Sequence, residues 1–204
     1  MIAIVDYGSG NIQAVKNIYD KLNIVSYFAR TAEDLERADK IILPGVGAFD
    51  QAMGQLNESG MKAKLDELVL IKKVPILGVC VGMQIMANSS EEGHLAGLGW
   101  FDAMVKIFDV SKLNIKPKLP HMGWNSVTVN QDHSILKGVD LETGFYFLHS
   151  YFVECENVDE VLFTSFYGAE FHCAINKNNI FGFQFHPEKS HHNGINLFKN
   201  FAGL

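Results

Sequence analysis

Short apolar runs alternate with helix-like segments through the first half of the chain. The run at residues 2–6 ends in a glycine turn, and apolar residues then recur at helical spacing from 12 to 22. Further runs at 23–29, 40–43 and 76–79 are each followed by a helical pattern. Such alternation predicts a parallel sheet covered by helices on both faces, because each crossover helix has to pack against the sheet.

Beyond residue 97 the pattern changes to closely spaced strands separated by turn residues. We expect strands at 101–108, 126–129, 144–153, 161–167, 170–176 and 180–185, and then a final amphipathic helix. No repeat, low-complexity tract or linker interrupts the pattern. We therefore predict one α/β domain over residues 1–204, a doubly wound, mixed and mostly parallel sheet flanked by helices.

Composition excludes several classes of protein. The net charge is −6 with no cluster of basic residues and interleaved aromatics, which argues against a nucleic-acid partner. No apolar run approaches the ~20 residues that span a bilayer, and the N-terminus reads as a strand rather than a signal peptide. The 3 cysteines are widely spaced, so we expect no disulfide framework, no metal site and a reducing, cytoplasmic location.

Cys80 lies in the segment Gly-Val-Cys-Val-Gly (78–82), between a predicted strand and a predicted helix. This pattern is the cysteine form of a nucleophile elbow, in which a strained turn lifts the nucleophile above the sheet edge. Flanking glycines are needed where the backbone approaches closely, and the helix N-terminus favours a thiolate. The alternative is a buried cysteine that only fills space; that is our expectation for Cys155 and Cys173.

His186, Pro187 and Glu188 follow a predicted strand near the end of the chain. A thiol nucleophile needs a base, and its leaving group needs an acid; a histidine can serve as both near neutral pH. Glu188 is placed to orient the imidazole if both side chains project from one side of an extended segment. We therefore predict that Cys80, His186 and Glu188 form a catalytic triad that works through a thioester.

Two glycine-rich turns follow buried strands. The loop around Gly45, Val46 and Gly47 can present backbone N–H groups to an oxyanion. The turn at 8–10 is not a dinucleotide-binding fingerprint, because position 13 is glutamine where a third glycine is required. We expect this second turn to line a surface near the active site.

Together these segments resemble the class I, or triad, glutamine amidotransferases, which have a flavodoxin-like fold. The resemblance covers essentially the whole chain, and it is strongest to the glutaminase subunits that serve histidine biosynthesis. Segments 43–49 (Leu-Pro-Gly-Val-Gly-Ala-Phe) and 120–125 (Pro-His-Met-Gly-Trp-Asn) point to those subunits. Departures from the family pattern are conservative, such as Val79 and Val81 beside the cysteine.

The resemblance implies a role for each matching position and needs no cofactor. Cys80 attacks the carboxamide of L-glutamine, and the oxyanion is held by backbone N–H groups of Gly45, Val46, Gly47 and Val81. The implied substrate pocket comprises Gln84, Glu92, His149, Ser150 and Tyr151. The implied partner is a (β/α)8-barrel cyclase subunit that receives the ammonia in a heterodimer, met through Asn11, Trp124 and Lys189.

Three alternatives remain open on the sequence. A cysteine peptidase or γ-glutamyl hydrolase would share the elbow and release its product to water. A glutaminase subunit of anthranilate or guanylate synthesis would share the triad, although segment 120–125 disfavours it. A binding module that has lost activity would be expected to have lost triad residues as well.

Overall fold

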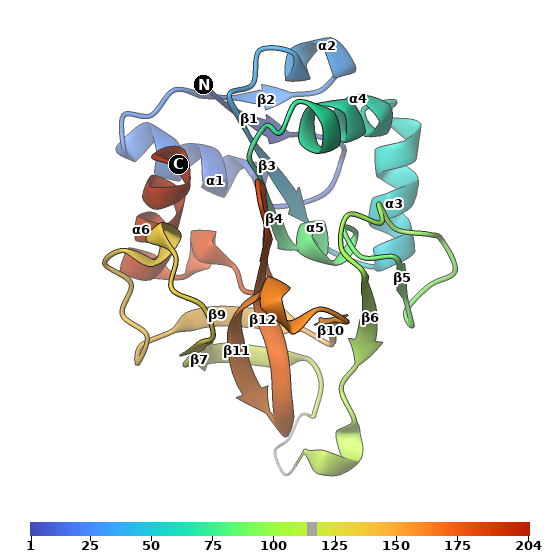
Figure 1. Cartoon of the computed structure of the whole chain (residues 1–204), viewed down its shortest axis with the longest axis vertical. Helices are drawn as coiled ribbons and strands as arrows, with labels where there is room; N and C mark the ends of the chain where they lie inside the picture. The colour runs from blue at the N-terminus through green and yellow to red at the C-terminus, as the bar shows by residue number, and fades with distance from the viewer. Residues whose placement is uncertain (114–117) are drawn as a thin grey trace.

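The parallel half of the sheet places the strand ends that carry the site. A computed structural model describes residues 1–113 and 118–204 (Figure 1). In it β1 (Ile2–Val5) lies between β2 (Ser26–Ala29) and β3 (Lys40–Gly45), and β4 (Ile76–Cys80) and β13 (Ile180–Phe183) follow β3. All these neighbours pair in parallel, so their carboxyl ends meet at one edge of the sheet.

The other half of the sheet is largely antiparallel. The order continues from β13 through β12, β10 and β6 to the short β5, while β11 pairs with both β12 and β8. A separate ribbon is formed by antiparallel β7 and β9. The bounds are β5 (Ser89–Ser90), β6 (Ala103–Ile107), β7 (His121–Asn125), β8 (Thr128–Val129), β9 (Phe145–His149), β10 (Tyr151–Cys155), β11 (Val161–Tyr167) and β12 (Ala169–Lys177). The predicted mixed α/β sheet is confirmed.

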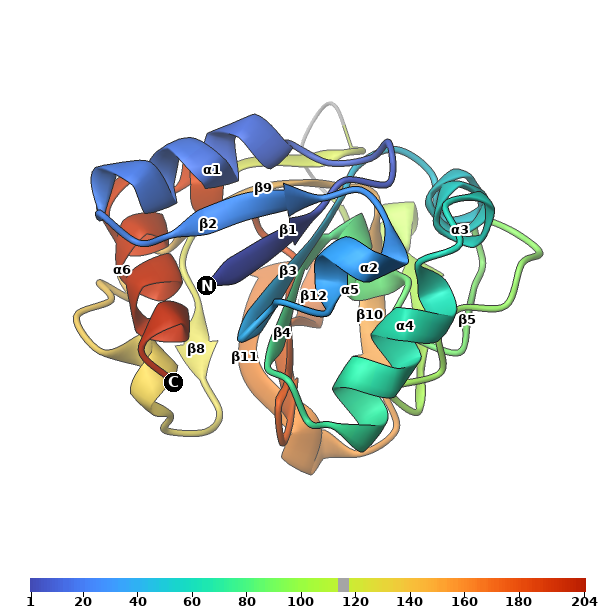
Figure 2. The same ribbon diagram turned by 90° about the horizontal axis from the view of Figure 1, so that it is seen from above.

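Helices cover both faces of the parallel half, as Figure 2 shows from above. On one side α1 (Ile12–Lys21) packs beside α6 (His191–Ala202). On the other lie α3 (Phe49–Glu58), α4 with its π-helical continuation, and the short α5. The bounds of the remaining helical elements are α2 (Ala32–Leu35), α4 (Lys62–Asp66), its continuation η1 (Glu67–Ile71), α5 (Val81–Gln84), η2 (Val110–Lys112), η3 (Ser134–Leu136), η4 (Val158–Glu160) and η5 (Pro187–Lys189). Among the described residues, no helix has both the length and the apolarity needed to cross a bilayer.

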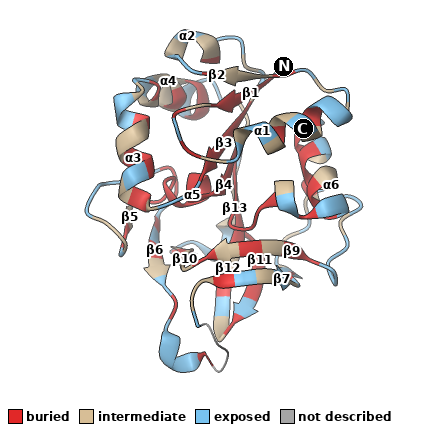
Figure 3. Cartoon of the chain, turned by 180° about the vertical axis from the view of Figure 1, so that it is seen from behind, coloured by how far each residue is buried: buried red, intermediate tan, exposed pale blue. Residues whose placement is uncertain are grey.

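The core lies between these layers, where Figure 3 shows the central strands buried. Every residue of β1, β4 and β13 is buried, which explains their continuous apolar sequences, since strands covered on both faces cannot alternate with polar residues. At the junction with the β7–β9 ribbon, the rings of Phe145 and Phe185 stack with their centroids 3.9 Å apart. This aromatic packing fixes the segment that follows β13 against the ribbon.

Two sequence expectations about elements need correction. The strand expected at 144–153 is two strands, β9 and β10, which belong to different sheets and meet at Ser150. Runs of apolar and aromatic residues lie on both sides of Ser150, so the sequence pattern does not reveal that the chain changes sheet there. The helix predicted after Cys80 is short and ends at Gln84, because Met86 and Ala87 donate to carbonyls three residues back in tighter turns.

Candidate active site

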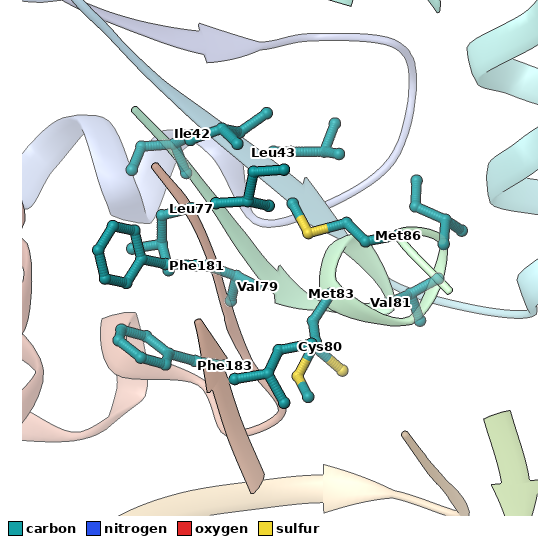
Figure 4. Packing of buried hydrophobic residues seen from close by; sticks show 14 of the residues in the cluster. Ile42, Leu43, Leu77, Val79, Cys80, Val81, Met83, Met86, Phe181 and Phe183 are labelled. Atoms are coloured by element: carbon teal, nitrogen blue, oxygen red, sulfur yellow. The ribbon is translucent and has the colours of Figure 1, made fainter. Parts of the chain in front are cut away.

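The elbow at the end of β4 holds Cys80 in an unusual backbone conformation. Its φ of 55° and ψ of −112° lie outside the regions that L-residues favour. The glycines make this turn possible: a Cβ on Gly82 would lie 1.9 Å from the carbonyl oxygen of Leu43, and a Cβ on Gly78 would lie 2.7 Å from the oxygen of Gly82. Figure 4 shows Cys80 at the end of β4, beside Met83. The strand-to-helix elbow predicted from the sequence is present.

His186 and Glu188 form a buried pair on the segment that follows β13. The Nδ1 atom of His186 lies 2.8 Å from Oε1 of Glu188, and their side chains are only 4% and 2% exposed. The segment is a turn of 3₁₀ helix, η5, rather than the extended chain that we expected. Pro187 is compatible with it because proline suits the first helical position, where its missing N–H costs no hydrogen bond.

The charge state of His186 is governed by its two neighbours. Burial lowers its pKa, but hydrogen bonds to and charges on Cys80 and Glu188 outweigh burial and raise the pKa to about 10. An imidazole with so high a pKa stays protonated at neutral pH. The geometry therefore supplies a nucleophile, a proton carrier and an orienting carboxylate in the order that a thioester mechanism needs.

The loop after β3 is held by the glycine turn at 8–10. The hydroxyl of Ser9 accepts a hydrogen bond from the N–H of Val46 and donates one to the carbonyl of the same residue, each at 2.9 Å. The Tyr7 hydroxyl donates to the carbonyl of Pro44 at 2.8 Å. In this conformation the Val46 N–H donates to Ser9 and is not free to hold an oxyanion, the role that the family resemblance implies for it.

A pocket of about 300 Å³ opens over Cys80. It brings together most of the site residues expected from the sequence, while Gly45 lies outside it, at the end of β3 paired with Cys80. Its lining is Val46, Gly47, Cys80, Val81, Gln84, Glu92, Pro120, Leu148, His149, Ser150, Tyr151, His186 and Lys189. A space of this size accommodates a small polar molecule of about amino-acid dimensions.

Polar side chains around the pocket are already hydrogen-bonded. Glu92 accepts a hydrogen bond from the Phe49 N–H at the start of α3, at 2.8 Å. The carbonyl of Tyr151 accepts from Nε2 of Gln84 at 3.0 Å and from Nδ1 of His149 at 2.8 Å. These contacts fix Gln84 and His149 as parts of the wall that surrounds Cys80.

The candidate interface residues lie around the segment that carries His186. Trp124, 42% exposed, stacks on His191 with ring centroids 5.4 Å apart. The ammonium of Lys189 lies 5.7 Å from the ring centroid of Tyr146, and Asn11 is exposed just before α1. Of the three, only Lys189 lines the pocket over Cys80; Asn11 lies beside His186 and Glu188, and Trp124 lies farther along, beside His191.

Three residues that contact the pocket lining were not predicted from the sequence: Ser9 contacts Val46, His121 contacts His149, and Gln184 contacts Cys80. Ser9 was recognised only as part of a turn, and its contact with Val46 crosses 37 residues of sequence. His121 Nδ1 lies 3.0 Å from Nε2 of His149 across the β7–β9 ribbon. Gln184 could have been predicted from the sequence, because it precedes His186 by two residues, and residues at that spacing face the same side of an extended chain.

Comparisons with known proteins agree with this geometry. The family "Glutamine amidotransferase class-I" matches residues 3–203. This chain belongs to that family. Amidotransferases named "Imidazole glycerol phosphate synthase subunit HisH" are similar to it over the full length of both chains: the one from Leptospira interrogans is 50% identical and the one from Bdellovibrio bacteriovorus is 54% identical.

The fold of the amidotransferase also matches solved structures. A chain of PurLQS from Thermotoga maritima superposes with a TM-score of 0.73 over 99% of this chain and 97% of the other, at 16% sequence identity. At that identity the likeness concerns the fold alone. It supports the flavodoxin-like, class I amidotransferase architecture predicted from the sequence.

Proposed function

We propose that this chain is the glutaminase subunit of an imidazole glycerol phosphate synthase, and that residues 1–204 work as one amidotransferase domain. It hydrolyses L-glutamine to glutamate and ammonia for histidine biosynthesis. The observation that carries the proposal is the pocket in which Cys80 meets the His186–Glu188 pair, in a chain 54% identical over its whole length to a HisH subunit.

The proposed reaction begins at the sulfur of Cys80. The thiolate attacks the carboxamide carbon of glutamine, and His186, protonated by the proton of the thiol, gives that proton to the departing ammonia. Glu188 holds the imidazole through Nδ1, so that the other ring nitrogen faces the reaction. A water molecule then attacks the thioester, glutamate leaves, and the thiolate returns. The reaction as written needs neither a metal nor a cofactor.

The pocket walls provide the binding groups in this proposal. Gln84, Glu92 and the His149–Tyr151 segment hold the glutamine, and the Glu92 carboxylate suits its α-ammonium group. Backbone N–H groups of Val81 and the Gly45–Gly47 loop hold the oxyanion. Because the Val46 N–H is bonded to Ser9, we expect the isolated chain to have little glutaminase activity until this peptide is released.

Ammonia is the product that matters for the partner. At neutral pH free ammonia is mostly ammonium, which is a poor nucleophile, so direct transfer to the acceptor preserves its reactivity. We propose that the acceptor is a (β/α)8-barrel cyclase subunit, docked in a heterodimer over Asn11, Trp124 and Lys189. It converts a ribulosyl-formimino carboxamide nucleotide to imidazole glycerol phosphate and an aminoimidazole carboxamide nucleotide. We expect this pair to work in the cytoplasm, without a nucleic-acid or membrane partner.

A glutaminase assay with and without a barrel cyclase and its nucleotide tests this function. We expect weak activity from the chain alone and strong activity, with ammonia appearing in the cyclase product, only when both are added. Cleavage of γ-glutamyl peptides in preference to glutamine would instead indicate a hydrolase. Full glutaminase activity in a Cys80→Ala variant would refute the proposed mechanism.

A further inference from the structure

A buried glutamine lies against the sulfur that the proposed mechanism uses. Gln184 is fully buried, and its Nε2 atom lies 3.7 Å from Sγ of Cys80. It follows β13, one residue after Phe183, which pairs with Val79 of β4. This register places Gln184 beside Cys80, and His186, two residues on in the bend after β13, also reaches Cys80. The position is thus built into the parallel pairing of β4 and β13.

The orientation of the Gln184 amide follows from its other hydrogen bonds. The Tyr151 carbonyl can only accept, so the atom of Gln84 that lies 3.0 Å from it is the NH₂ group. The same NH₂ group lies 3.0 Å from Gln184 and has to donate there, so it meets Oε1 of Gln184. The NH₂ group of Gln184 is therefore left to face Cys80.

An N–H donor aimed at sulfur matters most when the sulfur is charged. A hydrogen bond to an ionised acceptor is markedly stronger than one to a neutral acceptor, and thiols are weak acceptors. The chain itself puts no carbonyl or carboxylate oxygen against this NH₂ group among the contacts of the described residues. Loss of the thiolate would leave a buried donor poorly satisfied, which favours the thiolate form.

We propose that Gln184 is a further catalytic residue. Its Oε1 atom accepts from Gln84, and its NH₂ group donates a hydrogen bond to the Cys80 thiolate. The inference rests on the proposed function. In the second half-reaction, water attacks the acyl carbon, the C–S bond breaks, and its electron pair goes to sulfur. Gln184 then stabilises the sulfur that leaves, while His186 removes the proton from the attacking water.

The test is the pH dependence of alkylation of Cys80 by iodoacetamide, followed on the Cys80 peptide by mass spectrometry. His186 faces Cys80, Glu188 lies behind His186, and Tyr7 approaches from the β1 side; all three are unchanged in Gln184→Met. We expect the midpoint pH of alkylation to rise by about one unit or more, the tenfold effect of losing a hydrogen bond to a charged group. We also expect kcat for glutamine to fall about tenfold with little change in KM.

The matched control is Asn176→Met, an equivalent amide-to-thioether change in the neighbouring β12–β13 hairpin, where the Asn176 amide donates to the carbonyls of Asn178 and Ile180. It should keep the wild-type midpoint. If Gln184→Met does not fold, Gln184→Asn withdraws the donor from Cys80 while keeping an amide. The ultraviolet absorbance of the Cys80 thiolate, at about 240 nm, provides a second measurement of its ionisation. A wild-type midpoint in any folded Gln184 variant overturns the inference. A wild-type protein whose Cys80 is unreactive would overturn the proposed function as well.

Discussion

At the scale of single residues, the site depends on contacts that decide which atoms carry protons. Glu188 is buried and is hydrogen-bonded to His186 through Oε1. We predict that Glu188→Gln lowers glutaminase activity by about a hundredfold or more, by analogy with loss of the orienting carboxylate in other triads. Because the carboxylate helps to raise the pKa of His186 to about 10, the alkaline limb of activity should also move to lower pH.

The pH profile of kcat/KM in the presence of the cyclase checks this prediction. The alkaline limb moves to lower pH because the imidazolium of His186 is the acid that protonates ammonia. Activity persists until the pH rises through the pKa of His186, so a lower pKa makes activity fall at a lower pH. Glu170→Gln, an exposed change on β12, is the control and should keep the wild-type limb. An unchanged alkaline limb in Glu188→Gln would remove Glu188 from the proposed triad.

Ser9 gives a second prediction at the residue scale. Its hydroxyl occupies both the N–H and the carbonyl of Val46, so Ser9→Ala should free the two peptide groups that flank Val46 to turn. A net hydrogen bond contributes about 0.5–1.5 kcal/mol, so glutaminase activity without a partner should rise between about twofold and tenfold. Ser59→Ala is the control, because Ser59 makes the same pair of backbone contacts, to Leu56 and Met61, away from the pocket. Equal basal rates in the two variants would argue against a restraining role for Ser9.

At the scale of elements, the elbow requires close contact between β3, β4 and α5. Gly82→Ala would put a Cβ 1.9 Å from the Leu43 carbonyl, whereas a Cβ on Gly54 of α3 meets nothing within 4 Å. We predict that Gly82→Ala lowers the free energy of unfolding by about 2 kcal/mol or more, since backbone on both sides has to shift. Gly54→Ala should raise it by about 0.5–1 kcal/mol, the helix propensity difference. Urea unfolding of both variants measures these changes in the free energy of unfolding. Changes of the same sign in Gly82→Ala and Gly54→Ala would contradict the close packing described at Gly82.

Elements also show how far sequence reasoning reaches in this chain. Strands β1, β4 and β13 were predictable because each is a continuous apolar run of buried residues, and Cys80 was predictable because its glycines surround it locally. The strand switch at Ser150 was not, since pairing partners leave no trace in the alternation of one strand. Ser9, His121 and Gln184 were missed because their partners lie 28 to 104 residues away in sequence. Local patterns place a nucleophile, but the hydrogen bonds around it are decided by topology.

At the scale of the whole molecule, the β7–β9 ribbon packs on the sheet through two buried histidines of its own: His121 stacks on Tyr167 of β11, and His149 donates to the Tyr151 carbonyl of β10. His121 is stacked between Phe147 and Tyr167, with ring centroids 4.8 Å and 4.1 Å away. Burial lowers the pKa of His121 to about 4; for His149, burial, reinforced by the charges of His121 and His186, lowers it to about 3. Asn125 adds an amide 3.3 Å from the outer nitrogen of His121. This contact between the ribbon and the sheet is therefore built for neutral imidazoles.

The docking of the ribbon should consequently weaken in acid. In the unfolded chain both histidines take up a proton near pH 6.5, but in the folded protein they do so only near pH 4 and pH 3. The unfolded state thus binds more protons below about pH 6.5, and stability falls as pH decreases through that window, by up to about 1.4 kcal/mol per pH unit for each histidine. Unfolding free energies measured in urea from about pH 7 to about pH 4 give the slope of stability against pH.

His121→Phe keeps the aromatic stacking and removes one titrating group, so the slope of its stability against pH should be shallower than that of the wild type. The exposed His94→Gln variant should keep the wild-type slope. Equal slopes in His121→Phe and the wild type would mean that acid acts elsewhere in the molecule.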